Sequence, residues 1–467
     1  MSEASPTTEP LARNLRGRHI QLIALGGTIG VGLFLGSARA IQVAGPGLLV
    51  NYAIAGAAVF VIMRALGELL MQRPAAGALA LIAEEFVGPF AGFATGWSYW
   101  FLWVVVGMAE LTAIGVYVHY WFPAIPQWLS ALCTLLLLFG SNLLAVRVFG
   151  ELEFWFAVIK ITAIVGLIAL GVFVLTCGGF GSLGRDASLA NLWTHGGLFP
   201  HGALGLLLTL QIVVFAYSGV EVVAMTAGEA ANPGVALPRA TRSIIYRILI
   251  FYIGTLVVIM ALIPWDRLSP TVSPFVAVFD RFGIPGGANV INFVVITAAA
   301  SSCNSGLYST GRMLYFLARR GQAPRAFARL SGEHVPANGV MLSAALMLVG
   351  VALNAVVPER AFIWVTSISL VGTLWTWIII LLAHLRYKRL TGASAAGRAS
   401  GISWVRGCNW LVILFLLAVT GLLALTPDTR VALYVAPLWF ALLGGVYRWR
   451  RGATCVATTA GYRSTAR

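Results

Sequence analysis

Long apolar runs, separated by short polar segments, follow one another along nearly the whole chain. Each run has roughly 20 residues, which is long enough to cross about 30 Å of hydrocarbon as a helix. The pattern therefore predicts an all-α polytopic membrane protein with twelve transmembrane helices. We place the spans at residues 20–42, 47–67, 88–118, 127–145, 153–177, 203–228, 244–264, 287–316, 337–357, 361–385, 409–426 and 430–448.

Composition and motifs exclude several classes of protein. Of the 467 residues, 59% are hydrophobic and 10% are charged, whereas a soluble domain carries about 25% charged residues. The sequence contains no HExxH, no GxSxG and no phosphate-binding GxxxxGK[ST] motif, so we expect neither an enzyme nor an ATP-driven pump. The six histidines and five cysteines are scattered, and we therefore predict no metal site and no cofactor other than a coupling proton.

The basic residues indicate an orientation in the membrane. With the N-terminus inside, 24 of the 31 lysines and arginines fall in inner segments and 6 fall in outer loops. Both termini are then cytoplasmic. The basic residues that give the net charge of +15 lie beside the anionic lipid of the inner leaflet, and we predict no nucleic-acid partner. The expected organisation is a tail at 1–19, a transport core at 20–390, the last two spans with their preceding loop at 391–448, and a tail at 449–467.

Two of the predicted spans contain segments that favour an interrupted helix. The first carries GGTIGVG and the sixth carries FAYSGVEVV, which covers Phe215–Val223. These spans are five apart, so matching interruptions indicate two inverted copies, spans 1–5 and 6–10. The glycines of the first span also fit the small-residue spacing of helix packing, which remains the alternative for that segment taken alone. A carboxylate beside the second interruption favours a binding site.

Three ionisable residues lie well inside predicted spans, namely Glu110, Lys160 and Glu221. Each costs at least about 2.5 kcal/mol near the bilayer centre, so each needs an explanation. Glu110 makes either a polar contact between helices or a functional one. Lys160 either extends its amine to the inner surface or lies buried, where loss of hydration lets it bind and release a proton near neutral pH. Glu221 either braces the interruption or binds an amine or a proton.

The sequence resembles the amino acid permeases of the amino acid–polyamine–organocation superfamily. The resemblance is carried by RNLRGRHIQLIALGGTIGVGLFLGS, AGPG, RALGELL, GWSYWF, FGELEFWFAVIKITAIV, FAYSGVEVVAMTAGEAANP, LPRATRSIIYRI and NSGLYSTGRMLYFLA. FLWVVVGMAE, PWDRLSPTVSPF and TPDTRVALYVAPLWF are nearest to the subgroup that carries D-serine, D-alanine and glycine. That subgroup favours aspartate where this chain has Glu110.

The resemblance implies the leucine-transporter fold in the bacterial inner membrane. It also implies import of small neutral amino acids, namely D-serine, D-alanine and glycine, with L-alanine as a further candidate, by proton symport with alternating access. Proline or aromatic amino acids remain alternative substrates, and a non-transporting amino acid sensor is a further alternative. The oligomeric state is left open.

The resemblance also implies two substrate-binding segments, residues 28–32 and residues 215–218 together with Glu221. In the first, the amides of Gly30, Val31 and Gly32 would bind the substrate carboxylate. The Thr28 carbonyl would accept from the substrate ammonium, with Ile29 between Thr28 and these amides.

In the second segment, the resemblance implies that the carbonyls of Phe215 and Ser218 complete the ammonium site, on either side of Ala216 and Tyr217. The Phe215 ring would form a lid, and Glu221 would brace the interruption. Lys160 matches a lysine that replaces a coupling sodium ion in proton-coupled relatives, and with Glu110 it is the candidate for proton coupling.

Overall fold

In a computed structural model of the chain, the residues described are 29–72, 77–144, 146–178, 186–222, 224, 246, 248–269, 272–331, 334–392 and 399–464. Within these ranges every regular element is a helix. The prediction of an all-α protein is therefore confirmed for this part of the chain.

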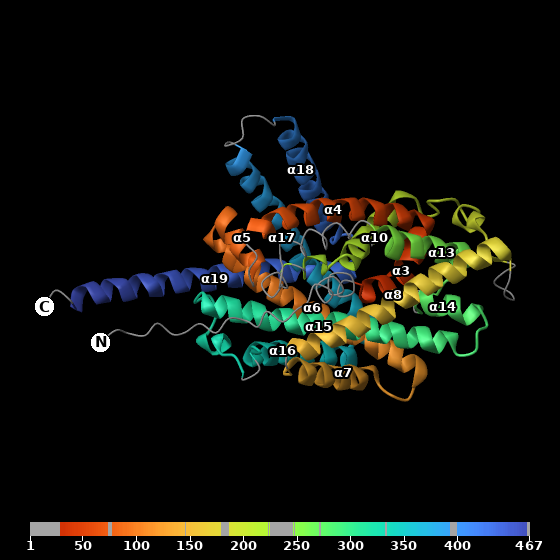
Figure 1. The fold of residues 1–467 in the computed structure, drawn as a ribbon, viewed down its shortest axis with the longest axis horizontal. Helices are drawn as coiled ribbons and strands as arrows, with labels where there is room; N and C mark the ends of the chain where they lie inside the picture. Colours follow the sequence, from red (N-terminus) through yellow and green to blue (C-terminus); the bar gives the residue numbers. More distant parts are fainter. Residues whose placement is uncertain are drawn as a thin grey trace.

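Most of the long helices run roughly parallel and form one bundle, from which α18 (Ala399–Leu422) projects at a steep angle (Figure 1). The long helices are α4 (Leu48–Gln72), α6 (Pro89–Trp121), α7 (Gln127–Asn142), α8 (Val146–Cys177), α10 (Gly202–Ala216), α15 (Gly287–Arg319), α16 (Ala337–Val356), α17 (Pro358–Gly392), α18 and α19 (Pro427–Ser464). Shorter helices are α2 (Val31–Phe34), α3 (Gly36–Ala44), α5 (Ala78–Phe86), α13 (Thr255–Leu262) and α14 (Pro274–Arg281). Among the described residues, nine stretches are long and apolar enough to cross a membrane, and two shorter apolar helices accompany them. The protein is thus polytopic, while the predicted number of twelve spans is not established.

Helices α6 and α15 lie side by side in the middle of the bundle, and α17 packs along α6 (Figure 1). A small residue permits this close approach, because a Cβ added to Gly306 of α15 would lie 3.0 Å from the Trp103 ring of α6. The central pair forms one wall of the site described below.

Several helix ends differ from the predicted spans, and α8 and α19 are two examples. Helix α8 begins at Val146, whereas the apolar pattern placed the start of this span at residue 153. Helix α19 continues to Ser464 through residues expected to form a tail from 449 onwards. Hydropathy reports where lipid contact ends, whereas a helix ends only where its backbone hydrogen bonds stop, so the two boundaries need not coincide.

The second predicted interruption is visible, whereas the first is described only from Ile29 onwards. Ile29 and Gly30 are not helical, and α2 begins at Val31. Helix α10 ends at Ala216, and the following turn contains Gly219 with a φ of 93°, a left-handed conformation that glycine adopts without strain. A short 3₁₀ helix, Val220–Val222, comes next. The inverted relation between spans 1–5 and 6–10 stays a prediction.

Candidate functional site

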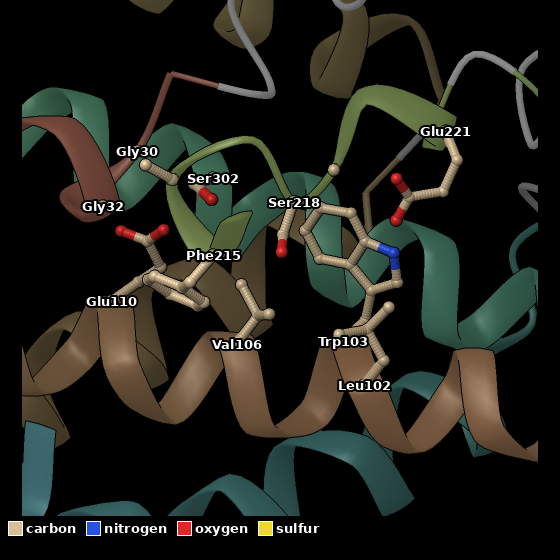
Figure 2. Close-up of a pocket in the computed structure, with 12 residues that line it drawn as sticks. Gly30, Gly32, Leu102, Trp103, Val106, Glu110, Phe215, Ser218, Glu221 and Ser302 are labelled. Atoms are coloured by element: carbon tan, nitrogen blue, oxygen red, sulfur yellow. The ribbon is translucent and has the colours of Figure 1, made fainter. Parts of the chain in front are cut away.

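A cavity of about 350 Å³ lies where the two interruptions meet the central helices (Figure 2). It is lined by Gly30, Gly32, Leu102, Trp103, Val106, Glu110, Phe215, Ala216, Ser218, Gly219, Glu221 and Ser302. The interruptions supply backbone and small side chains on one side, and α6 supplies an apolar wall on the other. Seven residues that the sequence assigned to binding or coupling therefore line a single space, namely Gly30, Gly32, Glu110, Phe215, Ala216, Ser218 and Glu221.

Glu110 of α6 points its carboxylate at the first interruption (Figure 2). Its Oε2 accepts a hydrogen bond from the Val31 amide at 3.3 Å, and Ser302 of α15 lines the same cavity. A Cβ added to Gly30 would collide with Oε1, so the carboxylate packs directly against the glycine backbone. The first amides of a helix have no carbonyl acceptor within the helix, and here the Val31 amide finds a carboxylate instead. Glu110 therefore both joins helices and lies in the cavity.

Phe215 separates this cavity from a wider one of about 2,130 Å³, because it lines both. The wider cavity also reaches Gln127, Glu359 and Asp428, which lie in the first turns of α7, α17 and α19. These turns are at the end of the bundle that the basic residues predict to face the exterior. The Phe215 ring is 7% exposed and lies at the boundary between the two spaces.

The turn after α10 is held by side chains from other helices. The Ser218 hydroxyl lies 2.9 Å from the Thr373 hydroxyl of α17. Glu221 is fully buried and accepts a hydrogen bond from Trp377 Nε1, also of α17, at 3.1 Å. Glu221 thus lines the cavity and at the same time ties the interruption to α17.

Two residues of the second predicted binding segment, Phe215 and Tyr217, make hydrogen bonds within the protein. The Phe215 carbonyl accepts from the Ser218 amide at 2.9 Å, which leaves a second lone pair on that oxygen. Tyr217 does not line the cavity; its hydroxyl donates to the Tyr52 carbonyl at 3.0 Å, and its ring packs against Tyr252. Tyr217 therefore anchors the turn from behind.

Lys160 lies inside the protein rather than at its surface. Its side chain is fully buried, and it is roughly 20 Å along α8 from the first residue of that helix. Its Nζ donates to the Ile29 carbonyl at 3.3 Å and to the Ser301 hydroxyl at 3.0 Å. Extension to the inner surface is excluded by this geometry. The amine instead holds the residue next to Gly30, one layer behind the cavity.

Sequence reasoning missed Glu153 of α8, which is fully buried and joined to Lys160 through Ser301. The predicted span began at this residue, so its carboxylate seemed to lie at the membrane boundary. The sequence does contain a signal for this pairing. Glu153 and Lys160 are seven residues apart, and residues at that spacing lie on the same face of a helix. Thr28 lies outside the described residues. Among the described residues no group of three histidine, cysteine or acidic side chains is suited to a metal ion.

The fold and the cavity define a polytopic membrane protein with interrupted helices around a small, partly polar internal site. The chain belongs to the amino acid permease family, whose model matches residues 19–454. It is 50% identical over 440 residues to the uncharacterized amino acid permease YtnA of Bacillus subtilis (strain 168), covering 94% of this chain and 95% of that protein.

Two further relatives carry more specific names. The aromatic amino acid transport protein AroP of Escherichia coli (strain K12) is 44% identical, with 96% of this chain and 98% of that protein covered. The probable threonine/serine transporter YbxG of Bacillus subtilis (strain 168) is 45% identical, with 93% and 94% covered. The protein is thus an amino acid permease rather than an enzyme. These names do not single out the D-serine, D-alanine and glycine subgroup.

Proposed function

We propose that this chain imports small neutral amino acids, with D-serine, D-alanine and glycine as first candidates, by symport with protons. The observation that carries the proposal is the hydrogen bond between the Glu110 carboxylate and the Val31 amide inside the cavity. An amide that holds one carboxylate in this cavity is suited to hold the carboxylate of an amino acid.

The substrate would lie with its carboxylate at the first interruption and its ammonium at the second. The amides of Val31 and Gly32, at the start of α2, favour an anionic group. On the other side, the Phe215 and Ser218 carbonyls and the Glu221 carboxylate favour a cation. Both charges of the zwitterion would then be matched at the centre of the protein, which avoids the cost of burying either charge unpaired.

Glu110 would couple the proton to the substrate by competition. While its carboxylate is ionised, it accepts from Val31 and occupies the place of the substrate carboxylate. A hydrogen bond to a charged acceptor contributes about 1.5–3 kcal/mol, and protonation removes most of that gain. Protonated Glu110 would therefore release the amide, so that the amino acid binds with a proton. Lys160 would serve as the second coupling residue, because it holds Ile29 beside the same segment.

Alternating access would begin at Phe215. The ring closes the substrate cavity toward the wider cavity, which supports a gate at the side predicted to be extracellular. Opening to the cytoplasm would require the interrupted helices to rock against α6 and α15. We place the protein in the bacterial inner membrane with both termini in the cytoplasm, as the distribution of basic residues indicates.

Small neutral amino acids and aromatic amino acids are the two candidate groups of substrate. Trp103 and Phe215 restrict the cavity, which supports a small side chain. The name of the AroP relative supports an aromatic substrate instead. A competition panel of twenty amino acids and several D-forms against labelled D-alanine or phenylalanine distinguishes the two.

Uptake into proteoliposomes tests the whole proposal. With an inward proton gradient, we expect labelled amino acid to accumulate above its external concentration, and we expect an uncoupler to abolish accumulation. Accumulation that survives the uncoupler would refute proton coupling. Binding without any flux would favour the sensor alternative.

A further inference from the structure

A buried chain of polar side chains connects three helices behind the substrate cavity. Lys160 Nζ donates to Ser301 Oγ of α15 at 3.0 Å, and Ser301 Oγ donates to Glu153 Oε2 at 2.8 Å. All three side chains are fully buried. The hydrogen bonds share one direction, from the amine through the hydroxyl to the carboxylate, which is the arrangement required for proton transfer along the chain.

The other oxygen of Glu153 is held equally firmly. Asn304 Nδ2 of α15 donates to Oε1 at 3.0 Å, and Asn142 Nδ2 of α7 donates to Asn304 Oδ1 at 2.6 Å. A buried carboxylate is costly unless it is paired and hydrogen-bonded, and here both conditions are met. Glu153 therefore does more than join helices, because the charge of its carboxyl group depends on the protonation of the neighbouring Lys160 amine.

The charges that act on Lys160 come from two helices. Glu153 on its own helix and Glu110 of α6 both interact electrostatically with the amine. Glu110 reaches the Val31 amide, and Lys160 reaches the Ile29 carbonyl, so both act on the same interrupted segment. A proton that leaves Lys160 therefore changes the hold on Ile29 without passing through the substrate cavity.

We propose that Glu153 is the proton acceptor of Lys160, and that the Ser301 hydroxyl relays the proton between them. In this step an Nζ–H bond of Lys160 breaks as a new Oγ–H bond forms on Ser301. The original Oγ–H bond of Ser301 breaks as an O–H bond forms on Glu153 Oε2. The products are a neutral amine and a neutral carboxylic acid, so the total charge is unchanged. The inference rests on the proton coupling proposed above.

The direction of this step fits import. Glu153 lies roughly 10 Å along α8 from its first residue, whereas Lys160 lies roughly 20 Å along, so the proton moves toward the end predicted to be cytoplasmic. Phe149, one turn before Glu153, stacks on Tyr308 of α15 with ring centroids 4.0 Å apart. Both residues are buried at this contact between α8 and α15. The neutral amine is a weaker donor, so the relay loosens Ile29 as the proton moves inward.

The test uses the full-length protein in proteoliposomes with two independent readouts. The first is exchange of labelled against unlabelled amino acid, which needs no net proton movement. The second is accumulation driven by a pH gradient of one unit, for which coupling to one proton predicts about tenfold accumulation. Glu153→Gln removes the acceptor but keeps the size of the side chain. Ser301→Ala removes the bridge but keeps both charged groups. Glu151→Gln makes the same chemical change two residues away on α8, at a less buried position on a different face of the helix, and serves as the control.

We expect Glu153→Gln and Ser301→Ala to lose accumulation while exchange stays within about threefold of the wild-type rate, and Glu151→Gln to keep both. Accumulation that persists in Ser301→Ala overturns the relay, even if Glu153→Gln has lost it, because Glu153 then acts only as a counter-charge. Accumulation that persists in both overturns the role of Glu153 altogether. If Glu153→Gln fails to fold, Ser301→Ala alone decides. Wild-type exchange without any proton-driven accumulation would instead overturn the proposed symport.

Discussion

Gly32 is the position where a single methyl group should disturb the site most directly. A Cβ at residue 32 would lie 2.6 Å from the Ala216 Cα, which is backbone and cannot rotate away. Ordinary contact begins near 3.4 Å, so the two interrupted segments would have to separate by about 0.8 Å in Gly32→Ala. Both residues line the cavity, and the separation therefore alters the distance between the proposed carboxylate and ammonium subsites.

The expected magnitudes follow from this displacement. Overpacking of this kind costs about 1–3 kcal/mol of stability, and misplacement of a site by nearly 1 Å costs on the order of 100-fold in rate. Gly36→Ala, at the start of α3 in the same predicted span, is the matched control, because its new Cβ would meet the Ile212 Cγ2 atom at 3.3 Å, a side-chain atom that can yield. Initial rates of labelled uptake, together with Tm in detergent, measure both effects. Wild-type uptake by Gly32→Ala would refute the close apposition of the two interruptions as a requirement for transport.

Three further substitutions test the other parts of the site. Lys160→Gln should lose pH-driven accumulation while substrate binding survives, whereas unchanged accumulation would leave Lys160 a purely structural role. Phe215→Ala should raise KM about tenfold or more by joining the two cavities, with Phe215→Leu intermediate; equal KM values in all three proteins would contradict the gate. Trp377→Phe should lower Tm more than Trp375→Phe. Trp377 donates to the buried Glu221 carboxylate, whereas Trp375 donates to the neutral Thr95 hydroxyl. A hydrogen bond to a charged group contributes about 1.5–3 kcal/mol, and one between neutral groups contributes about 0.5–1.5 kcal/mol. Equal Tm losses would argue against an ionised Glu221.

The helical class was predictable because a backbone that crosses lipid must satisfy its hydrogen bonds within a helix or a closed barrel. Helix ends were not, because apolar length marks the membrane rather than the helix. Helix α8 begins at Val146, before the predicted span, and α19 continues to Ser464, after the predicted span; both extensions contain charged residues. Helix α5 was also not predicted, since its nine residues are too few to cross the membrane.

The backbone part of the site was predictable from local composition. Gly30 and the Ser218–Gly219 turn mark places where a helix is weakened, and the structure brings both to one cavity together with Gly32 of α2. The α6 wall was not predictable, because Leu102, Trp103 and Val106 resemble lipid-facing residues in a continuous apolar helix. Only the packing of α6 against α15 shows which of its faces is turned to the cavity.

Glu153 was missed for two reasons: the position of a predicted span boundary and a contact between residues far apart in the sequence. Its proposed role was hidden because the predicted span began at Glu153, and because its bridge, Ser301, is distant in sequence. Spacing within one helix can suggest that Glu153 and Lys160 share a face. The contact between α8 and α15 is needed to show that a hydroxyl joins them.

The central claim is that an amino acid and a proton cross together, and simultaneous recording of both fluxes tests it most directly. Proteoliposomes loaded with a pH-sensitive dye receive labelled amino acid in the absence of any imposed gradient. The account predicts internal acidification that saturates at the same amino acid concentration as uptake and that disappears in Lys160→Gln. Uptake that saturates while the internal pH stays constant would contradict it.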